Sequence, residues 1–179
     1  PLTPMQEGML FHSLYELESG LYIEQIRLSF AGKLDPSLFQ EAWKEVVLRH
    51  APLRTLFLWK KQKQPLQVVR RHVELEWTFK DARNAPPTER DSLIQNITQE
   101  NRDKGFDLTK APLSRWTLVQ TGDETWEFIW TWHHMILDGW SVSLILKDAS
   151  EFYTHRESNA PEPRAPQFQQ YVQWLQKRD

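Results

Sequence analysis

Residues 125–139 read TWEFIWTWHHMILDG, and the elements on both sides are arranged around this stretch. Its first half alternates large aromatic residues with smaller or polar ones, which is the period-two pattern of a strand with one buried face. Residues 121–124 separate it from another strand-like run at 113–120, which predicts a hairpin. After Gly139 the pattern becomes helical, from about Ser141 to Thr154. Two histidines and an aspartate therefore lie where a strand ends and a helix begins, a common location for functional residues.

Strand geometry predicts that His133 and His134 have different roles. Adjacent side chains of a strand point to opposite faces, so the two imidazoles are not expected to act as one pair. A histidine can exchange a proton near neutral pH, and an aspartate can orient an imidazole or anchor a turn. We interpret the aromatic face of residues 126–132 as packed sheet surface rather than the wall of an acyl tunnel. No partner spacing predicts a site at the other four histidines, which are His12, His50, His72 and His155.

The remaining elements are predicted from caps and periodicity. Thr3, Pro4 and Gln6 form a capping-box pattern that starts a helix to about residue 17. Met5, Met9, Leu10 and Phe11 are expected to face inward from it. Further predictions are a strand at 22–31, a helix from 36, and a meander of strands at 53–59, 66–71 and 73–79. A helix capped by Thr88 is expected to run through 104, followed after the hairpin by a proline-rich connector at 159–166 and a short terminal helix. In the helix after Gly139, the predicted core stripe consists of Leu144, Ile145, Ala149 and Phe152.

This order of elements predicts an α+β fold in which helices cover a mixed or mostly antiparallel sheet. A chain of 179 residues is long enough for one domain with a sizeable core. The net charge is −2 with both signs interspersed, so no basic stripe indicates nucleic acid. The chain contains no cysteine, which excludes a disulfide framework, a thiol nucleophile and a cysteine-ligated metal site. No apolar run reaches about 18 residues and the start lacks a signal-peptide pattern, so we expect a cytoplasmic protein.

Four stretches of the chain resemble motifs of one family. HHMILDG at 133–139 matches the HHxxxDG signature of the condensation domains of nonribosomal peptide synthetases, which are relatives of chloramphenicol acetyltransferase. The family's other motifs are matched in the same order by LTPMQEGMLFH at 2–12, RHAPLRT at 49–55 and FDL through PLSR at 106–115. The resemblance runs through residues 1–179 but covers only the first half of a condensation domain. It therefore implies an N-terminal lobe with a chloramphenicol acetyltransferase-like fold.

The resemblance also implies a reaction and a set of site residues. Condensation domains form an amide bond between two aminoacyl or peptidyl thioesters carried on separate proteins. The family's catalytic histidine corresponds to His134, which would act as a general base or would position the attacking amine. His133 would be a scaffold residue, and Asp138 would pair with Arg54 to hold the loop. Gly139 would provide a conformation or a close approach that a Cβ would obstruct.

The same resemblance implies the partners. Phosphopantetheine would arrive as the tether of the substrates on donor and acceptor peptidyl carrier proteins, and this chain would bind no cofactor or metal of its own. The C-terminal lobe of the same domain would complete the site, because the family's active site lies between two lobes. We therefore expect the isolated segment to be nearly inactive. Neither nucleic acid nor a membrane is an expected partner.

Other functions stay open at this point. Epimerization domains share HHxxxDG, whereas heterocyclization domains have aspartate in place of its first histidines. The opening motif and Leu137 resemble condensation domains that take a D-configured or dual epimerized donor more than the common L-donor type. A noncatalytic interaction module would keep the signature and present only a binding surface. A metal hydrolase using His134 and Asp138 would need a third ligand, and none has motif-like spacing.

Overall fold

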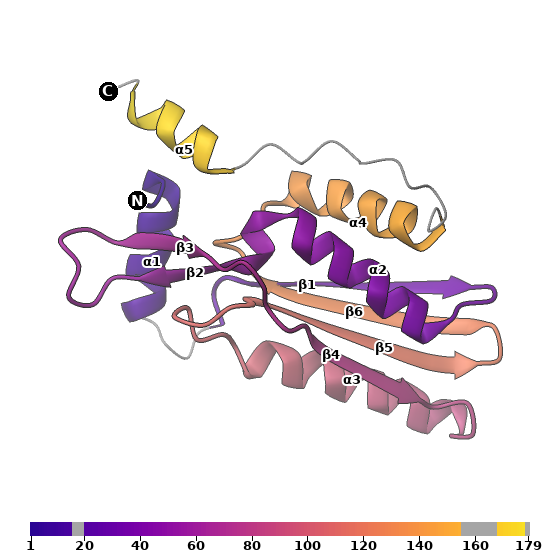
Figure 1. Cartoon of the computed structure of the whole chain (residues 1–179). Helices are drawn as coiled ribbons and strands as arrows, with labels where there is room; N and C mark the ends of the chain where they lie inside the picture. The colour runs from indigo at the N-terminus through magenta and orange to yellow at the C-terminus, as the bar shows by residue number, and fades with distance from the viewer. Residues whose placement is uncertain (16–19, 155–167, 178–179) are drawn as a thin grey trace.

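A computed structural model describes residues 1–15, 20–154 and 168–177 of the chain. Helices cover both faces of a central sheet, and a short two-stranded sheet lies at one end (Figure 1). The elements in chain order are α1 (Pro4–Tyr15), β1 (Ile23–Ala31), α2 (Pro36–Arg49), the 3-10 turn η1 (Ala51–Arg54), β2 (Thr55–Leu58), β3 (Leu66–Val69), β4 (Glu76–Asp81), α3 (Pro87–Asp103), β5 (Ser114–Gly122), β6 (Thr125–His133), α4 (Gly139–Thr154) and α5 (Phe168–Gln176).

The main sheet is mixed, with the strand order β1-β6-β5-β4. β6 pairs antiparallel with β5 on one side and with β1 on the other, whereas β4 runs parallel to β5. The predicted hairpin at residues 113–132 is thereby confirmed, and it forms the centre of the sheet. Ile23 of β1 lies opposite His133, so both central strands and the start of β1 meet where β6 ends.

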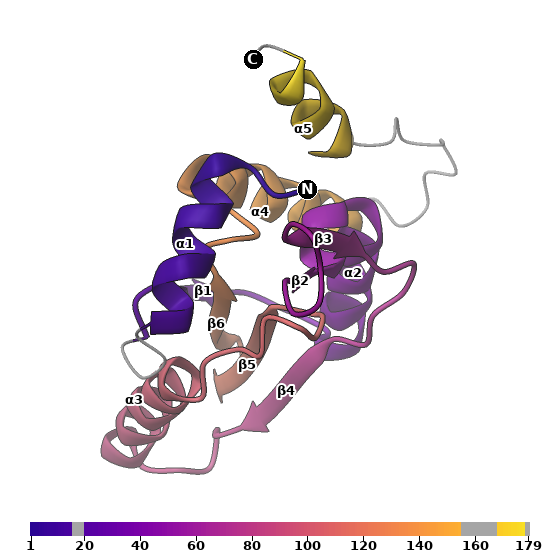
Figure 2. The same cartoon turned by 90° about the vertical axis from the view of Figure 1, so that its left-hand side faces the viewer.

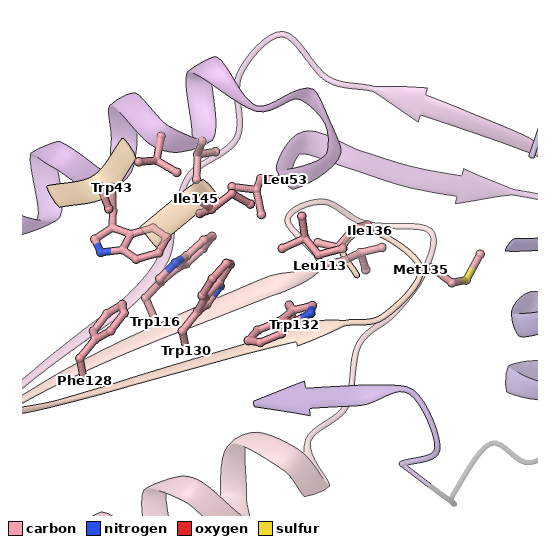
Figure 3. Packing of buried hydrophobic residues seen from close by; sticks show 14 of the residues in the cluster. Trp43, Leu53, Leu113, Trp116, Phe128, Trp130, Trp132, Met135, Ile136 and Ile145 are labelled. Carbon is pink, nitrogen blue, oxygen red and sulfur yellow. The ribbon is translucent and has the colours of Figure 1, made fainter. Parts of the chain in front are cut away.

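The aromatic face of β6 is packed sheet surface, as predicted, and α2 lies against it. Trp126, Phe128, Trp130 and Trp132 are all buried, and Trp43 of α2 contacts Phe128, Trp130 and the neighbouring Trp116 of β5. The Trp43 ring centroid is 5.0 Å from that of Trp130 and 5.2 Å from that of Phe128. Figure 3 shows Trp116, Phe128 and Trp130 side by side on the sheet, with Trp43 above them on the helix side. Burial of several such rings anchors β6 firmly, since each contributes a large apolar area.

The opposite face of the sheet is covered by α3. Ile129 of β6 and Val119 of β5 are fully buried there against Ile94 and Ile97 of the helix. Alternation along β6 therefore directs its even-numbered aromatic residues to α2 and its odd-numbered residues to the α3 side. The structure thus confirms the strand that the period-two pattern predicts.

The predicted order of helices and strands is confirmed, but three details are wrong. The strand expected at 73–79 does not continue the meander, because β4 lies beside β5 and its Trp77 packs on Phe39 of α2, with ring centroids 6.0 Å apart. Thr88 does not cap α3, which begins one residue earlier, after Pro86. Leu144 is 63% exposed and lies outside the core stripe, whereas Ile145 and Ala149 are buried. The predicted connector at 159–166 lies outside the described residues.

Of the four residues predicted to face inward from the N-terminal helix, Leu10 is buried and Met9 packs partly buried on the core, but Met5 and Phe11 are exposed. Met5 and Phe11 are 71% and 57% exposed, while Gln6 and Leu10 are buried. The capping box itself is confirmed, because the Thr3 N–H donates to Gln6 Oε1 at 2.9 Å and the Gln6 N–H donates to Thr3 Oγ1 at 3.2 Å. The buried stripe thus contains a polar residue, whose partner is described below. In the part of the chain that the structure describes, no helix is both long and apolar enough to cross a membrane.

Candidate functional site

The segment after β6 is held by backbone hydrogen bonds to two neighbouring strands. The His133 N–H donates to the carbonyl of Leu113, just before β5, at 3.0 Å. The His134 N–H donates to the carbonyl of Tyr22, just before β1, at 2.8 Å. The backbone of both histidines is therefore fixed by the ends of adjacent strands, independently of their side chains.

The next three residues are apolar and buried in the core. Met135, Ile136 and Leu137 are 3%, 7% and 5% exposed and belong to the main core cluster. Figure 3 shows Ile136 directed toward Leu113 and Met135 at the end of the core. The Ile136 N–H donates to the His133 carbonyl at 3.1 Å, which closes a turn. Burial of three apolar side chains in one turn restricts its movement, because opening it would expose all of them to water.

His133 is buried and neutral in this arrangement. Its side chain is on the odd-numbered face of β6, and the residue is 5% exposed. The Met135 N–H donates to His133 Nδ1 at 3.2 Å, so Nδ1 is the acceptor and the neutral ring carries its proton on Nε2. Burial, with a smaller contribution from a positive charge on His134, lowers the pKa of His133 to about 4. The ring therefore stays uncharged at neutral pH.

His134 has a different environment, but it lies in the turn after β6, so its direction is not set by strand alternation. The residue is half-buried, and its Nδ1 atom is buried without a hydrogen-bond partner among the described residues. Within that part of the chain, no carboxylate orients this imidazole in the way that an aspartate orients the histidine of a hydrolase triad. A positive charge on His134 is a minor cause that lowers the pKa of Asp138. His134 thus combines a fixed backbone with a partly accessible ring.

Asp138 caps the helix that follows the loop. Its Oδ1 accepts from the Ser141 N–H at 2.8 Å and from the Ser141 hydroxyl at 2.7 Å. With α4 beginning at Gly139, Ser141 is the third helical residue, so this is the geometry of an N-cap. The Ser141 hydroxyl and then its N–H are the main causes that lower the pKa of Asp138. Asp138 therefore holds the start of α4, at the point where the loop ends.

The predicted pair between Asp138 and Arg54 is not formed. Arg54 Nε donates to the carbonyl of Val47 at 2.9 Å, and its terminal nitrogens donate to the carbonyls of Leu48, Arg70 and Arg71. These contacts satisfy the last turn of α2 and join it to the residues after β3. A guanidinium at the C-terminal end of a helix is favoured by the free carbonyls there. Arg54 is therefore committed to this junction and does not hold the histidine loop directly.

The expected steric role of Gly139 is also absent. A Cβ built at this position meets no atom within 4 Å, and its φ is not in the left-handed region. Gly139 is exposed at the start of α4, beside Trp140, which is 87% exposed. The surface next to His134 and Asp138 is thus open in the described part of the chain.

Two further polar contacts, one to the loop and one between α4 and the end of α2, have no counterpart in the sequence predictions. Gln6 Nε2 donates to the carbonyl of Met135 at 3.1 Å, which joins α1 to the loop. On α4, Asp148 Oδ2 lies 2.6 Å from His50 Nε2 and 3.0 Å from Arg49 Nε, at the end of α2. Neither contact follows from local spacing, because the partners are 129 and 98 residues apart. For the contact with Asp148, the Arg49-His50 pair in the 49–55 motif is the sequence feature that could have indicated it.

The site offers little for a metal ion. Among the residues that the structure describes, His, Cys, Asp and Glu side chains form no group of three that could hold one. His134 and Asp138 therefore lack, within those residues, a third neighbour of the kind that a zinc site requires.

Comparison with known proteins gives the family. A sequence model of the condensation domain matches residues 1–179. The chain belongs to the condensation domain family. It is 40% identical over 180 residues to a linear gramicidin synthase of Brevibacillus parabrevis and 35% identical over 181 residues to bacitracin synthase 3 of Bacillus licheniformis. These alignments cover 99% and 100% of this condensation domain chain but 4% and 3% of the two synthases.

Solved structures agree on the fold. The starter condensation domain of rhizomide synthetase superposes with a TM-score of 0.86 at 18% identity, over 99% of this chain and 43% of that one. The first condensation domain of the calcium-dependent antibiotic synthetase gives a TM-score of 0.79 at 20% identity, over 92% and 39% of the two chains. This condensation domain chain thus spans less than half the length of either solved chain. The predicted fold class is confirmed, and the four motifs identify the family correctly.

Proposed function

We propose that this chain is the N-terminal lobe of a condensation domain that forms amide bonds between two carrier-tethered thioesters, with His134 at the chemistry. The observation that supports His134 most strongly is the contrast between the two histidines. One is buried, neutral and hydrogen-bonded within its own turn, whereas the other presents a partly accessible ring from a rigid backbone. A preorganised backbone with an accessible imidazole is what positioning of a reactant requires.

The proposed reaction needs no covalent intermediate on the protein. The acceptor amine attacks the donor thioester carbonyl, so that a carbon–nitrogen bond forms and the carbon–sulfur bond breaks. The amine nitrogen loses one proton, and the phosphopantetheine thiolate that leaves gains one. His134 would take the proton from nitrogen as a general base, which typically contributes about 10²- to 10⁴-fold, or would accept a hydrogen bond from the amine and so orient it. In either role the ring must be uncharged when the amine arrives.

We further propose that the site is completed by a second lobe from outside this sequence. Trp140 and Leu144 at the start of α4 are 87% and 63% exposed, next to Asp138 and Gly139. Exposed apolar side chains beside a candidate site are typical of a surface that another body covers. The donor and acceptor carrier proteins would then approach a cleft that this lobe closes on one side only. The isolated segment would bind no cofactor and would have little activity, and the complete protein would be cytoplasmic.

The test uses the condensation domain that contains this chain, with one carrier protein loaded as donor and another as acceptor. Amide product is followed by mass spectrometry for the parent domain, for His134→Ala and for residues 1–179 alone. We expect product from the parent, a sharp decrease in a folded His134→Ala variant, and almost none from the segment. Equal product from parent and variant would refute the role of His134. Isomerised donor without amide product would instead favour an epimerization domain, and carrier binding without any turnover would favour an interaction module.

A further inference from the structure

Gln6 is a polar residue in the buried stripe of α1, and both ends of its amide are occupied. The residue is 6% exposed. Its Oε1 accepts from the Thr3 N–H at 2.9 Å, and its Nε2 donates to the Met135 carbonyl at 3.1 Å. This assignment of oxygen and nitrogen follows from the partners, because a backbone N–H can only donate and a carbonyl can only accept.

We propose that Gln6 is a positioning residue that holds the His134 loop through the Met135 carbonyl. The proposal rests on the function proposed above, in which the His134 ring must be held in place. Met135 directly follows His134, and its peptide carbonyl points to α1 rather than to a strand. Backbone contacts fix the N–H groups of residues 133, 134 and 136, so Gln6 supplies the contact that fixes the carbonyl between them.

A second glutamine reduces the freedom of the first. Gln67 of β3 donates from Nε2 to Gln6 Oε1 at 3.3 Å and to the Pro1 carbonyl at 2.9 Å. One small polar network therefore joins the start of α1, the two-stranded sheet and the loop. Figure 2 shows α1 at the end of the fold where β6 leads into the loop. A buried carbonyl that loses its donor is costly to leave unpaired. The peptide after Met135 would turn toward another partner, and the His134 ring would move with it.

The two roles of Gln6, capping α1 and holding the loop, can be separated. The ionised carboxylate of Gln6→Glu keeps the side-chain acceptor for the Thr3 N–H, since glutamate is a normal partner in a capping box, but removes the donor to Met135. The measurements are made well above the pKa of the introduced carboxyl, because its protonated form would again donate to Met135. Thr3→Ala removes the Oγ1 that receives the Gln6 N–H and leaves the Gln6 amide intact. The first variant therefore affects the loop, and the second affects the start of the helix.

The experiment measures hydrogen exchange and kinetics for both variants in the complete condensation domain. For Gln6→Glu we expect faster exchange at residues 133–137, a kcat lower by about 10-fold or more, and a KM within about twofold, because misplacement of a reacting group by about 1 Å can cost up to 100-fold. For Thr3→Ala we expect faster exchange at the start of α1 and nearly unchanged kcat. If Gln6→Glu does not fold, Gln6→Met replaces it; because methionine lacks both the acceptor and the donor of Gln6, we then expect faster exchange at the start of α1 and at residues 133–137, whereas Thr3→Ala affects only α1.

Two results would overturn the proposal. One is a folded Gln6 variant with parental exchange at residues 133–137 and parental kcat. The other is an equal decrease of kcat in the Gln6 and Thr3 variants with exchange changed only in α1, which would reduce Gln6 to a helix cap. Failure of the proposed function is detected separately, as unchanged turnover in His134→Ala. The exchange at residues 133–137 supports or overturns the link from Gln6 to the loop whatever that variant shows.

Discussion

The burial of His133 makes the stability of the fold sensitive to mild acid. In the folded state its pKa is lowered to about 4, against 6.5 for an ordinary histidine. As pH falls below about 6.5, His133 becomes protonated in the unfolded chain but stays neutral in the folded chain. The free energy of unfolding therefore decreases. The contribution is complete above pH 6.5 and disappears as pH approaches 4. A difference of 2.5 pKa units corresponds to about 3 kcal/mol, of which about 2 kcal/mol is lost between pH 7 and pH 4.5.

The assay is urea unfolding of the complete domain at several pH values, for the parent and for His133→Asn. Asparagine offers an Oδ1 acceptor to the Met135 N–H in place of Nδ1 but does not titrate in this range. We expect the parent to lose about 2 kcal/mol more than the variant between pH 7 and pH 4.5. Parallel stability profiles for the two proteins would refute the conclusion that His133 is buried and neutral.

Three further predictions concern the start of α4 and its packing. Asp138→Ala should lower the free energy of unfolding by about 1 kcal/mol and Asp138→Asn by much less, since asparagine also accepts from the Ser141 N–H; equal losses in urea unfolding would refute the cap. Asp148→Ala should cost about 2 kcal/mol, because His50 loses its half-buried acceptor; an unchanged urea midpoint would argue against this link. Gly139→Ala should leave the thermal midpoint equal or higher, because a Cβ there meets no atom; a clear decrease would show that the glycine is needed by the fold.

The features that local pattern encodes are predictable from the sequence. The hairpin, the strand face of four aromatic residues and the change to helix after Gly139 all follow from periodicity and turn residues, and the structure contains them. The capping box at Thr3 and Gln6 is predictable for the same reason. The place of β4 beside β5 is not, because pairing between strands far apart in the chain leaves no local signal.

The failures at the site have a common physical cause. Apolar residues occur on several faces of α1, so the hydrophobic pattern of its sequence does not determine which face is buried. In the structure Gln6 is buried and its Nε2 donates to the distant Met135 carbonyl, whereas Met5 is exposed. Likewise, Arg54 donates to free carbonyls at the C-terminal end of α2 and does not pair with Asp138. Long-range polar contacts of this kind depend on the folded arrangement and not on spacing.

The two adjacent histidines are expected to differ in their effect on the reaction itself. The difference is measured as the single-turnover rate of amide formation by the complete domain, with preloaded carriers, for His134→Ala and for His133→Asn, each shown to be folded. We predict a fall of about 10²- to 10⁴-fold for His134→Ala, the usual range for a lost general acid or base, and less than about 10-fold for His133→Asn. Equal rates for His134→Ala and the parent, or a larger loss for His133→Asn, would contradict this division of roles.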